Sequence, residues 1–589
     1  MIGLYLYNPS SLKLLKPDPE ASKMNTLHKQ LGRIRLSIIL MIAFSSICIS
    51  SDHTPSPKKP PNILILLADD MGYSDLGCFG SEIQTPQLDQ LANHGLRFTQ
   101  FYNTARCWPT RAALLTGYYA QQVRRDTLPG IPSGNQSGTR PKWAPLLPAL
   151  LKESGYRSYH SGKWHIDGKP LKEGFDHSYQ LEDAGRFFSP KAHFEDDQPL
   201  PAVSRDSGYY STTEIATRMI KYLKDHASNH QDKPFFAYTA FLSPHFPLQA
   251  LQSDIDKYKE KYKNGWDQSR SARHDRQKSL GFNHQPLPEI ESNIGAPYPF
   301  PKAIERFGPG EVPFPKPWTE LTDVQKEFQA TKMAIHGAMI DRMDQEIGRI
   351  IAQLRAMNAL DNTMIVFLSD NGASAEMMIR DDGHDPHAAP GSADTHLCLG
   401  PGWSAVANTP FRRHKTWVHE GGIATSMIVH WPSGIKAKGE LRTQPGHVVD
   451  IVPTLLDLTG CNRPETMQGQ KVPPFAGVSL RNAITADQKI ERESLWWLHE
   501  GNQALRQGDW KLVMAKNEPW QLYDLSKDRG ETNDLSKTNP AQFQKMQQVW
   551  EREYQTVRDM AARDLTPEER KKAAEPAKKK ASAKKNNRE

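Results

Sequence analysis

Unbroken apolar runs, each followed by polar residues, recur along the chain and predict strands of a buried sheet. The runs are residues 63–68 (ILILLA), 235–242, 364–368 (MIVFL) and 426–431. A strand that is buried on both faces has such a continuous run, and this arrangement is typical of parallel sheets covered by helices. Each run is short enough for a strand and is bounded by residues that favour turns.

Helical patterns lie between these runs. Residues 85–94 have Pro86 near the start and Gly95 at the end, which predicts a helix with ordinary termini. Thr322 and Gln325 have the spacing of a capping box. One apolar stripe of the helix that follows contains Met339, Met343, Ile347, Ile350 and Leu354. Strands alternating with helices predict an α/β fold with a large mixed, mostly parallel sheet flanked by helices.

The pattern of apolar and polar residues changes after about residue 490. Short β-like pieces at 495–498, 510–514 and 520–525, a hairpin turn at 506–509 and a helix at 541–554 predict a small C-terminal antiparallel α+β subdomain. Before it, residues 254–320 are rich in proline and polar residues, and we expect a long excursion over the surface. The predicted segments are a leader (1–50), a linker (51–60), the main α/β domain (61–485), the C-terminal subdomain (486–562) and a basic low-complexity tail (563–589).

The formal net charge of +7 over 589 residues raises the question of a polyanionic partner. The charge lies at the two ends, however: residues 1–59 and 567–589 each carry a net +5, which leaves the body at about −3. We therefore predict no nucleic-acid partner. The hydrophobic content of 38% supports a large core and excludes wholesale disorder.

The apolar stretch 36–50 follows Lys29, Arg33 and Arg35 and is too short to cross a membrane. It is typical of a signal peptide, for which Met24 would be a suitable start. We predict export, to a periplasm or out of the cell, without a stable membrane span. The chain has only five cysteines, too few for a disulfide framework, and one disulfide among those after the leader stays open.

Two predicted strands end in oxygen ligands. Asp69 and Asp70 follow the first run, and Asp370 and Asn371 follow the third. Either pair alone would suit a turn after a strand equally well. Because sites in such sheets lie beyond the carboxyl ends of the strands, the two pairs together predict a metal site. Carboxylate and amide oxygens favour Ca²⁺ or Mg²⁺ over zinc.

Cys107 lies in the segment CWPTRAALLTG, with Pro109 and Arg111 at fixed spacing. A plain thiolate is a poor partner for a cage of oxygen ligands. This segment resembles the Cys-x-Pro-Ser/Thr-Arg signature of the type I sulfatases, the arylsulfatase branch of the alkaline phosphatase superfamily. The resemblance extends from about residue 61 to 535 and includes LADDMGYSDLGCFG, GYRSYHSGKWH, SPHFP, FLSDNGASAE and PFRRHKTWVHEGG.

The resemblance implies that a formylglycine-generating enzyme oxidises Cys107 to formylglycine, whose hydrate is the nucleophile and a metal ligand. It also implies Ca²⁺, in preference to Mg²⁺, on Asp69, Asp70, Cys107, Asp370 and Asn371. The residues implied to act on a sulfate ester are Arg111, which holds the hydrate, the sulfate-binding lysines Lys163 and Lys415, the base His165 and the acid His245.

The resemblance thus implies a sulfuric ester hydrolase that acts on an aryl or carbohydrate sulfate. A phosphoester or phosphonate monoester hydrolase of the same superfamily is the alternative enzyme, because sulfate and phosphate are isosteric. Two lysines, two histidines and one metal favour the singly charged sulfate monoester. A binding protein with an inactive site is the non-enzymatic alternative, which the intact motifs oppose.

Overall fold

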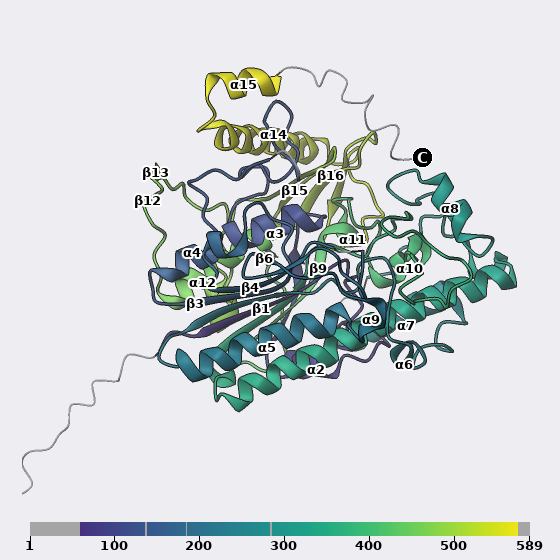
Figure 1. Ribbon diagram of the computed structural model, residues 1–589. Helices are drawn as coiled ribbons and strands as arrows, with labels where there is room; N and C mark the ends of the chain where they lie inside the picture. The colour runs from purple at the N-terminus through teal and green to yellow at the C-terminus, as the bar shows by residue number, and fades with distance from the viewer. Residues whose placement is uncertain (1–58, 136–137, 184, 283–284, 575–589) are drawn as a thin grey trace, which may run out of the picture. The chain divides into compact units, whose positions relative to one another are not determined.

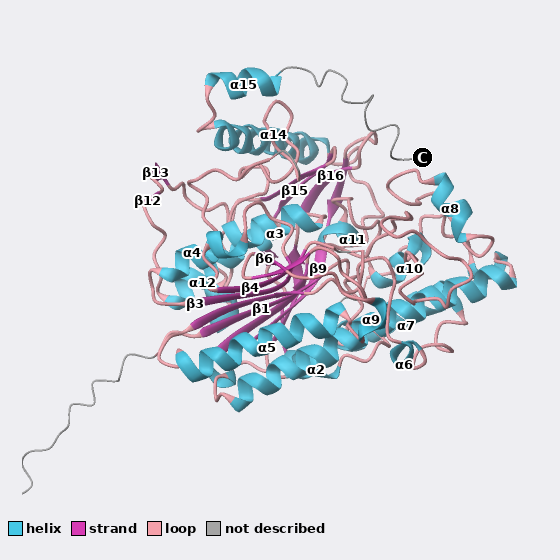
Figure 2. Ribbon diagram, in the orientation of Figure 1, coloured by secondary structure: helices cyan, strands magenta, loops and turns pink. Residues whose placement is uncertain are grey.

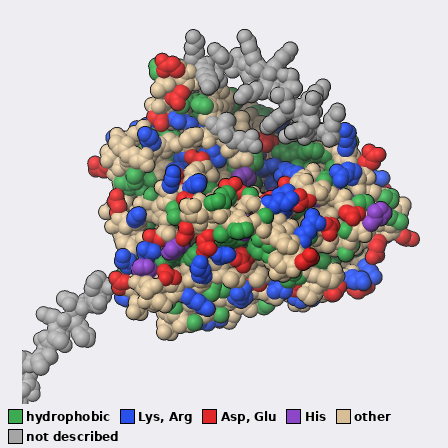
Figure 3. All heavy atoms as spheres, in the orientation of Figure 1, with side chains coloured by type: hydrophobic (Ala, Val, Ile, Leu, Met, Phe, Trp, Pro, Cys, Tyr) green, Lys and Arg blue, Asp and Glu red, His purple; other side chains and the backbone are tan. Residues whose placement is uncertain are grey.

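The computed structural model describes residues 59–135, 138–183, 185–282 and 285–574. The predicted leader, most of the linker and the last part of the basic tail lie outside the described residues. The described residues from Pro60 to Ala574 form one compact unit. No helix of the described ranges is long and apolar enough to span a bilayer. Acidic and basic side chains are interspersed over the face seen in Figure 3, as the small charge of the body leads one to expect.

A mixed sheet of eleven strands occupies the centre of the described structure (Figures 1 and 2). Its strands are β1 (Asn62–Ala68), β2 (Leu96–Tyr102), β3 (Arg157–Lys163), β4 (His177–Leu181), β5 (His193–Glu195), β6 (Gln198–Pro199), β7 (Phe235–Ala240), β8 (Thr363–Ser369), β9 (Ala424–His430), β10 (Glu440–Arg442) and β11 (Gly446–His447). The order is β10-β2-β9-β8-β1-β7-β3-β4-β5-β6, with β11 also paired to β2. The five neighbouring strands β8, β1, β7, β3 and β4 run parallel to one another, while β9 is antiparallel to both its neighbours, β8 and β2. The predicted fold class is confirmed, and all four apolar runs form strands.

Helices cover both faces of the sheet (Figure 2). They are α2 (Pro86–Asn93), α3 (Cys107–Thr116), α4 (Leu147–Lys152), α5 (Ser211–Asn229), α6 (Gln252–Ile255), α7 (Gly265–Ser279), α8 (Pro301–Phe307), α9 (Asp323–Ala356), α10 (Gly400–Ala407), α11 (Glu420–Ile423), α12 (Ile451–Thr459) and α13 (Arg481–Ala486). Short 3-10 helices are η1 (Gly77–Phe79), η2 (Pro170–Glu173), η3 (Arg205–Ser207), η4 (Trp318–Glu320), η5 (Leu360–Asn362) and η6 (Val448–Asp450). Alternate residues of β1 enter two separate cores: Leu64 and Leu66 pack with α2, α5 and α9, whereas Ile63 and Ile65 pack with α3, α4 and α12. This two-sided burial explains the unbroken apolar run.

The long helix α9 begins as its sequence predicts. The Thr322 hydroxyl accepts from the Gln325 backbone N–H at 3.3 Å, and the Gln325 side chain accepts from the Thr322 N–H at 3.0 Å. Both bonds of the capping box are therefore formed. The residues of its predicted apolar stripe, Met339 to Leu354, are all buried in the core.

Residues 254–320 do not form the surface excursion that the sequence predicts. They contain α7 and α8, and Trp266 of α7 is almost completely buried. Arg273, also in α7, is fully buried because it donates to Asp75 at 2.7 Å and to Glu82 at 2.8 Å. The prediction failed because α7 enters the protein through ion pairs, and buried arginines leave no apolar periodicity in the sequence.

The C-terminal subdomain contains an antiparallel sheet and a long helix. Its elements are β14 (Leu495–His499), β15 (Asn502–Gln507), β16 (Trp510–Met514), β17 (Gln521–Asp524) and α14 (Pro540–Ala562), preceded by a small hairpin of β12 (Thr466–Met467) and β13 (Gln470–Lys471). The first part of the predicted tail forms a further helix, α15 (Pro567–Ala574). Gln507 pairs with Trp510, so the predicted hairpin turn forms. Lys511 in β16 forms buried ion pairs with Glu420 at 2.9 Å and with Glu531 at 2.7 Å, and the pair with Glu420 joins the subdomain to α11. Cys78, Cys107, Cys398 and Cys461 are all free thiols.

Candidate active site at the carboxyl edge of the sheet

Four parallel strands bring their carboxyl ends to one edge of the sheet. Ala68 of β1 is in register with Ser369 of β8, so the polar residues that follow each strand become neighbours. Lys163 is the last residue of β3, and His245 lies five residues after β7. The predicted site residues therefore meet because parallel strands end together.

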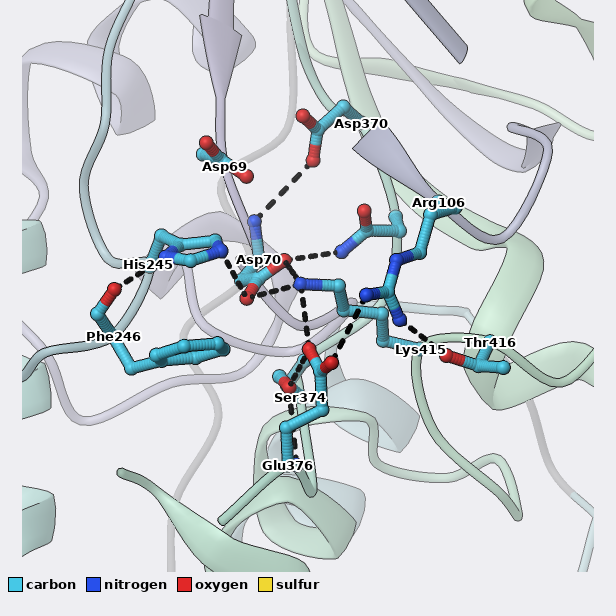
Figure 4. A network of polar contacts seen from close by, with 12 residues as sticks. Asp69, Asp70, Arg106, His245, Phe246, Asp370, Ser374, Glu376, Lys415 and Thr416 are labelled. Carbon is cyan, nitrogen blue, oxygen red and sulfur yellow. Dashed lines mark hydrogen bonds and ion pairs between the residues drawn. The ribbon is translucent and has the colours of Figure 1, made fainter. Parts of the chain in front are cut away.

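The four predicted oxygen ligands are buried and adjacent to one another, and Figure 4 labels the three aspartates among them. The backbone N–H of Asp70 donates to an Asp370 carboxylate oxygen at 3.4 Å, and the Asn371 amide donates to Asp70 at 2.7 Å. Asp69 Oδ1 and Asn371 Oδ1 are buried oxygens without a hydrogen-bond partner among the described residues. Unpaired buried oxygens of this kind are costly unless a cation or water binds them.

These buried carboxylates repel one another, and a bound cation would relieve that repulsion. Burial and the nearby Asp69 raise the pKa of Asp370. The pKa of Asp69 is lowered: burial opposes the shift, but Lys163, His245 and Arg111 outweigh it. A divalent ion at this point would offset the repulsion between the carboxylates, and the oxygen-rich ligand set suits a hard cation.

Donor atoms of Asp69, Asp70 and His245 all lie within 4.8 Å of one another. The resemblance to sulfatases implies a catalytic role for His245 and no metal role. His245 Nε2 lies 3.7 Å from Asp70, and Nδ1 faces the carbonyl of Phe246. Since that carbonyl can only accept, Nδ1 carries the proton and Nε2 faces the carboxylates.

Three cations bind the carboxylates directly. Arg111, in the second turn of α3, donates to Asp370 at 3.0 and 2.7 Å and to the Lys163 carbonyl at 2.9 Å. Lys163 forms an ion pair with Asp69. Lys415 lies 2.8 Å from an Asp70 oxygen. All three cations are buried, so their attraction to the carboxylates is only weakly screened by solvent.

Cys107 is the first residue of α3 and is 4% exposed. Burial raises the pKa of its thiol, although Lys163 and Lys415 oppose the shift. A neutral thiol is a weak nucleophile, so the unmodified side chain is not activated for catalysis by its surroundings.

The two predicted histidines are held neutral. Burial, followed by the positive charges of Lys163 and Arg111, lowers the pKa of His165 well below its usual value. Burial and Lys415 lower that of His245 in the same way, against the opposing charge of Asp69. The ring of His165 lies 3.2 Å from the Asn135 side-chain amide, measured from Nε2, and 5.9 Å from the Trp108 ring. Neutral imidazoles can take up a proton during a reaction at neutral pH.

A cavity of about 840 Å³ opens over these groups and is lined by charged side chains. The predicted residues that line it are Cys107, Lys163, His165, His245 and Lys415. Arg111 and the other metal-ligand candidates, Asp69, Asp70, Asp370 and Asn371, are buried beside these residues, so the predicted set converges on one place.

Sequence reasoning missed two residues at the floor of this cavity. Arg106 donates to Glu376 at 3.0 Å, and Glu376 also contacts Lys415 at 2.9 Å. Arg106 and Lys415 lower the pKa of Glu376 despite its complete burial. Glu376 stands in the motif FLSDNGASAE, which was the only available signal, and its partners are distant in the sequence.

The chain matches models of two protein families. Residues 61–461 match the sulfatase family, and residues 412–559 match the C-terminal region of N-sulphoglucosamine sulphohydrolase. An uncharacterised sulfatase of Schizosaccharomyces pombe is 31% identical over 84% of this chain and 93% of its own length. An arylsulfatase of Klebsiella aerogenes is 30% identical over 77% of this chain and 98% of its own length.

Solved structures share the fold at lower identity. Ps i-CgsB, crystallised with k-i-k-neocarrahexaose, has a TM-score of 0.59 at 23% identity and covers 84% of this chain and 93% of its own. A protein crystallised with its substrate D-glucosamine-2-N,6-O-disulfate has a TM-score of 0.57 at 20% identity, over 85% and 99% of the two chains. The family match over most of the chain, together with these relatives, establishes that the chain belongs to the sulfatase family, whose members hydrolyse sulfate esters.

Proposed function

We propose that this protein is a sulfuric ester hydrolase that uses an oxidised Cys107 and a calcium ion to cleave the sulfate monoester of an alcohol or phenol. The observation that carries the proposal is the convergence, in one cavity, of Cys107 with two lysines and two histidines above a group of buried carboxylates. In the net reaction water adds across the ester: an S–O bond breaks, the alcohol leaves with a proton, and inorganic sulfate is released.

The residues present fit both implied groups. Asp69, Asp70, Asp370 and Asn371 would hold the calcium ion, because two of their oxygens are buried without a partner among the described residues. When present, the oxidised Cys107 supplies the nucleophilic oxygen and calcium withdraws charge from the sulfate. Formylglycine formation would require a formylglycine-generating enzyme as a partner during maturation.

The two lysines are placed to bind the sulfate group of the substrate. Lys163 and Lys415 line the cavity, and each also contacts an aspartate at the metal-ligand candidates. Ammonium groups held in place by carboxylates provide electrostatic stabilisation without reorganisation during the reaction. Arg111 fixes the orientation of Asp370 through two hydrogen bonds.

The two histidines are placed to move protons. We assign His245 to protonate the leaving oxygen and His165 to remove a proton from Cys107 in its oxidised, hydrated form. Both rings line the cavity and both are neutral at rest. A histidine that begins neutral must first gain the proton it donates, and the carboxylate of Asp70 near His245 favours that gain.

A sulfated carbohydrate is our proposed substrate class. Among the relatives is an N-acetylglucosamine-6-O-sulfatase of Bacteroides thetaiotaomicron, 24% identical over 85% of this chain. The cavity is lined mainly by polar and charged groups, including Asn135, Gln180 and Asp183, which suit the hydroxyl groups of a sugar. We also propose export of the protein, on the strength of the predicted signal peptide.

Relative rates on 4-nitrophenyl sulfate and 4-nitrophenyl phosphate test the reaction class. We expect sulfate hydrolysis to be faster, and we expect Cys107→Ala to abolish it. Faster phosphate hydrolysis would favour the phosphoester alternative, and unchanged turnover in Cys107→Ala would contradict the assigned nucleophile.

A further inference from the structure

Most charged side chains that line the cavity have a partner of opposite charge. Asp167 lies 3.4 Å from Arg125, and Asp183 forms an ion pair with Arg186. The carboxylate of Asp381 lies 3.7 Å from the same arginine. These pairs leave little net charge on this part of the wall, so an unpaired charge there has a marked effect on what the cavity binds.

Arg380 differs from the other lysines and arginines that line the cavity because its side chain has no acidic partner among the described residues. It lines the cavity and is exposed, and its guanidinium forms neither a hydrogen bond nor an ion pair with any described residue. Its guanidinium carbon lies 5.3 Å from the centre of the Phe246 ring. A cation over an aromatic ring gains a modest attraction and keeps its hydrogen-bond donors free for a ligand.

Phe246 also sets an upper limit on the distance between Arg380 and Lys415, one of the two proposed sulfate-binding lysines. The ammonium nitrogen of Lys415 lies 5.4 Å from the centre of the same ring. Because both distances end at one ring centre, the two cations cannot be further apart than the sum of the two values. Two substituents of a single sugar residue, or of one substituted benzene ring, can reach across such a span.

We propose that Arg380 is a specificity-determining residue that binds a second anionic group, a carboxylate or a sulfate, on a substrate whose sulfate ester lies at Lys163 and Lys415. This inference rests on the proposed sulfatase activity. The planar guanidinium of Arg380 matches the two oxygens of a carboxylate or sulfate edge. Glu182 also lines the cavity and also has no ion pair with a described residue. Its carboxylate accepts a hydrogen bond from the Gln180 amide at 2.8 Å and suits a sugar hydroxyl instead of an anion.

Two aryl sulfates that differ in one charge test the proposal. The probes are 4-sulfooxybenzoate, which carries a carboxylate opposite the ester, and its methyl ester, which is neutral at that position. We expect Arg380→Gln to lower kcat/KM about tenfold for the carboxylate probe, or about 1.4 kcal/mol. For the methyl ester we expect little change, and the preference of the wild-type protein should weaken as ionic strength rises.

Two variants serve as controls. Arg380→Lys keeps the charge but loses the planar fork, so it should retain part of the preference. Arg355→Gln removes another exposed arginine, at the end of α9 and outside this cavity, and should leave both rates unchanged. The pair 4-hydroxyphenyl sulfate and benzene-1,4-diyl disulfate, compared per ester, repeats the test with a second sulfate in place of the carboxylate.

A binding measurement separates this inference from the proposed activity. Titration calorimetry on Cys107→Ala with calcium present gives the affinity ratio of each probe pair without turnover. A preference for either charged probe that Arg380→Gln removes, in rate or affinity, supports the assignment. Equal binding of charged and neutral probes, or a preference that survives Arg380→Gln, would overturn it even if the protein hydrolyses both esters.

Discussion

A carboxylate oxygen of Glu376 lies 2.9 Å from the ammonium nitrogen of Lys415 at the floor of the cavity. The other carboxylate oxygen of Glu376 accepts from Arg106 at 3.0 Å, and Lys415 also contacts Asp70. Figure 4 shows this chain of contacts. Glu376 therefore connects Arg106 to Lys415 and, through Lys415, to the candidate metal site, and we expect it to act as a positioning residue for Lys415.

Replacing Glu376 by Gln should lower both activity and stability. The change leaves Arg106 short of its buried partner, and breaking a buried ion pair costs about 3–5 kcal/mol. We expect an unfolding free energy lower by a few kcal/mol and a drop of at least tenfold in kcat on an aryl sulfate. Denaturant unfolding and steady-state kinetics measure the two effects.

The control for Glu376→Gln is Glu305→Gln, which removes an exposed carboxylate. It should change neither quantity. A Glu376→Gln protein with wild-type kcat would exclude the positioning role of Glu376, whatever its stability.

Lys415→Ala removes a proposed sulfate contact. Loss of a preorganised donor to the developing charge typically lowers kcat by about 10²–10³. We expect a loss of this size on an aryl sulfate, with the fold retained by circular dichroism. If kcat fell less than tenfold in a folded variant, Lys415 would not contact the transferring group.

Removal of calcium should reduce activity and lower the melting temperature together. A ligand at 100 times its Kd stabilises a protein by about 2.7 kcal/mol if it binds only the folded state. We therefore expect chelation with EGTA to lower Tm, and added Ca²⁺ to restore both Tm and activity. Asp370→Asn should weaken this response to Ca²⁺, and a Tm that does not depend on calcium in the wild-type protein would argue against the site.

The stability of the fold should depend on pH through Asp344, which does not line the cavity. Its carboxylate accepts the backbone N–H groups of Gln87 and Leu88, at 3.0 and 2.8 Å, at the start of α2. Burial raises the pKa of Asp344 to about 7, although these two N–H groups oppose the shift. The pKa of this carboxyl group is therefore higher in the folded protein than in the unfolded chain, where it is near 3.8. Protonation of Asp344 stabilises the folded protein fully at pH values below the unfolded pKa, and this contribution is lost as the pH rises through the folded pKa.

The test of this pH dependence is Asp344→Asn, whose amide oxygen can still accept a hydrogen bond. We expect the unfolding free energy of the variant, relative to wild type, to rise between pH 4 and pH 8. Denaturant unfolding at several pH values measures the difference. A difference that stays constant with pH would show that Asp344 does not titrate in this range.

The strand ends of the site could be predicted from the sequence for a physical reason. β1 and β8 are buried on both faces, so their apolar runs are continuous and their ends are marked by polar residues. Parallel pairing then brings Asp69 beside Asp370 without further information. The short motif at Cys107 and the spacing of Lys163 and His165 are likewise local features of the sequence.

The burial of α7 and the surroundings of Glu376 and Arg380 depend on contacts between residues that are far apart in the sequence. Arg273 lies in a polar helix whose burial follows from its ion pairs with Asp75 and Glu82. Glu376 and Arg380 become recognisable only when Lys415 and Phe246 are seen beside them. A single charged residue has no periodicity, so its surroundings must come from the structure.

The proposed reaction depends on Cys107, which we propose works as an oxidised residue beside a metal ion. Mass analysis of the peptide that contains Cys107, taken from purified and active protein, is the direct test of this assignment. We predict a peptide that has lost one sulfur and two hydrogens and gained one oxygen, the change from a thiol to an aldehyde. An unmodified thiol at Cys107 in fully active protein would contradict the account.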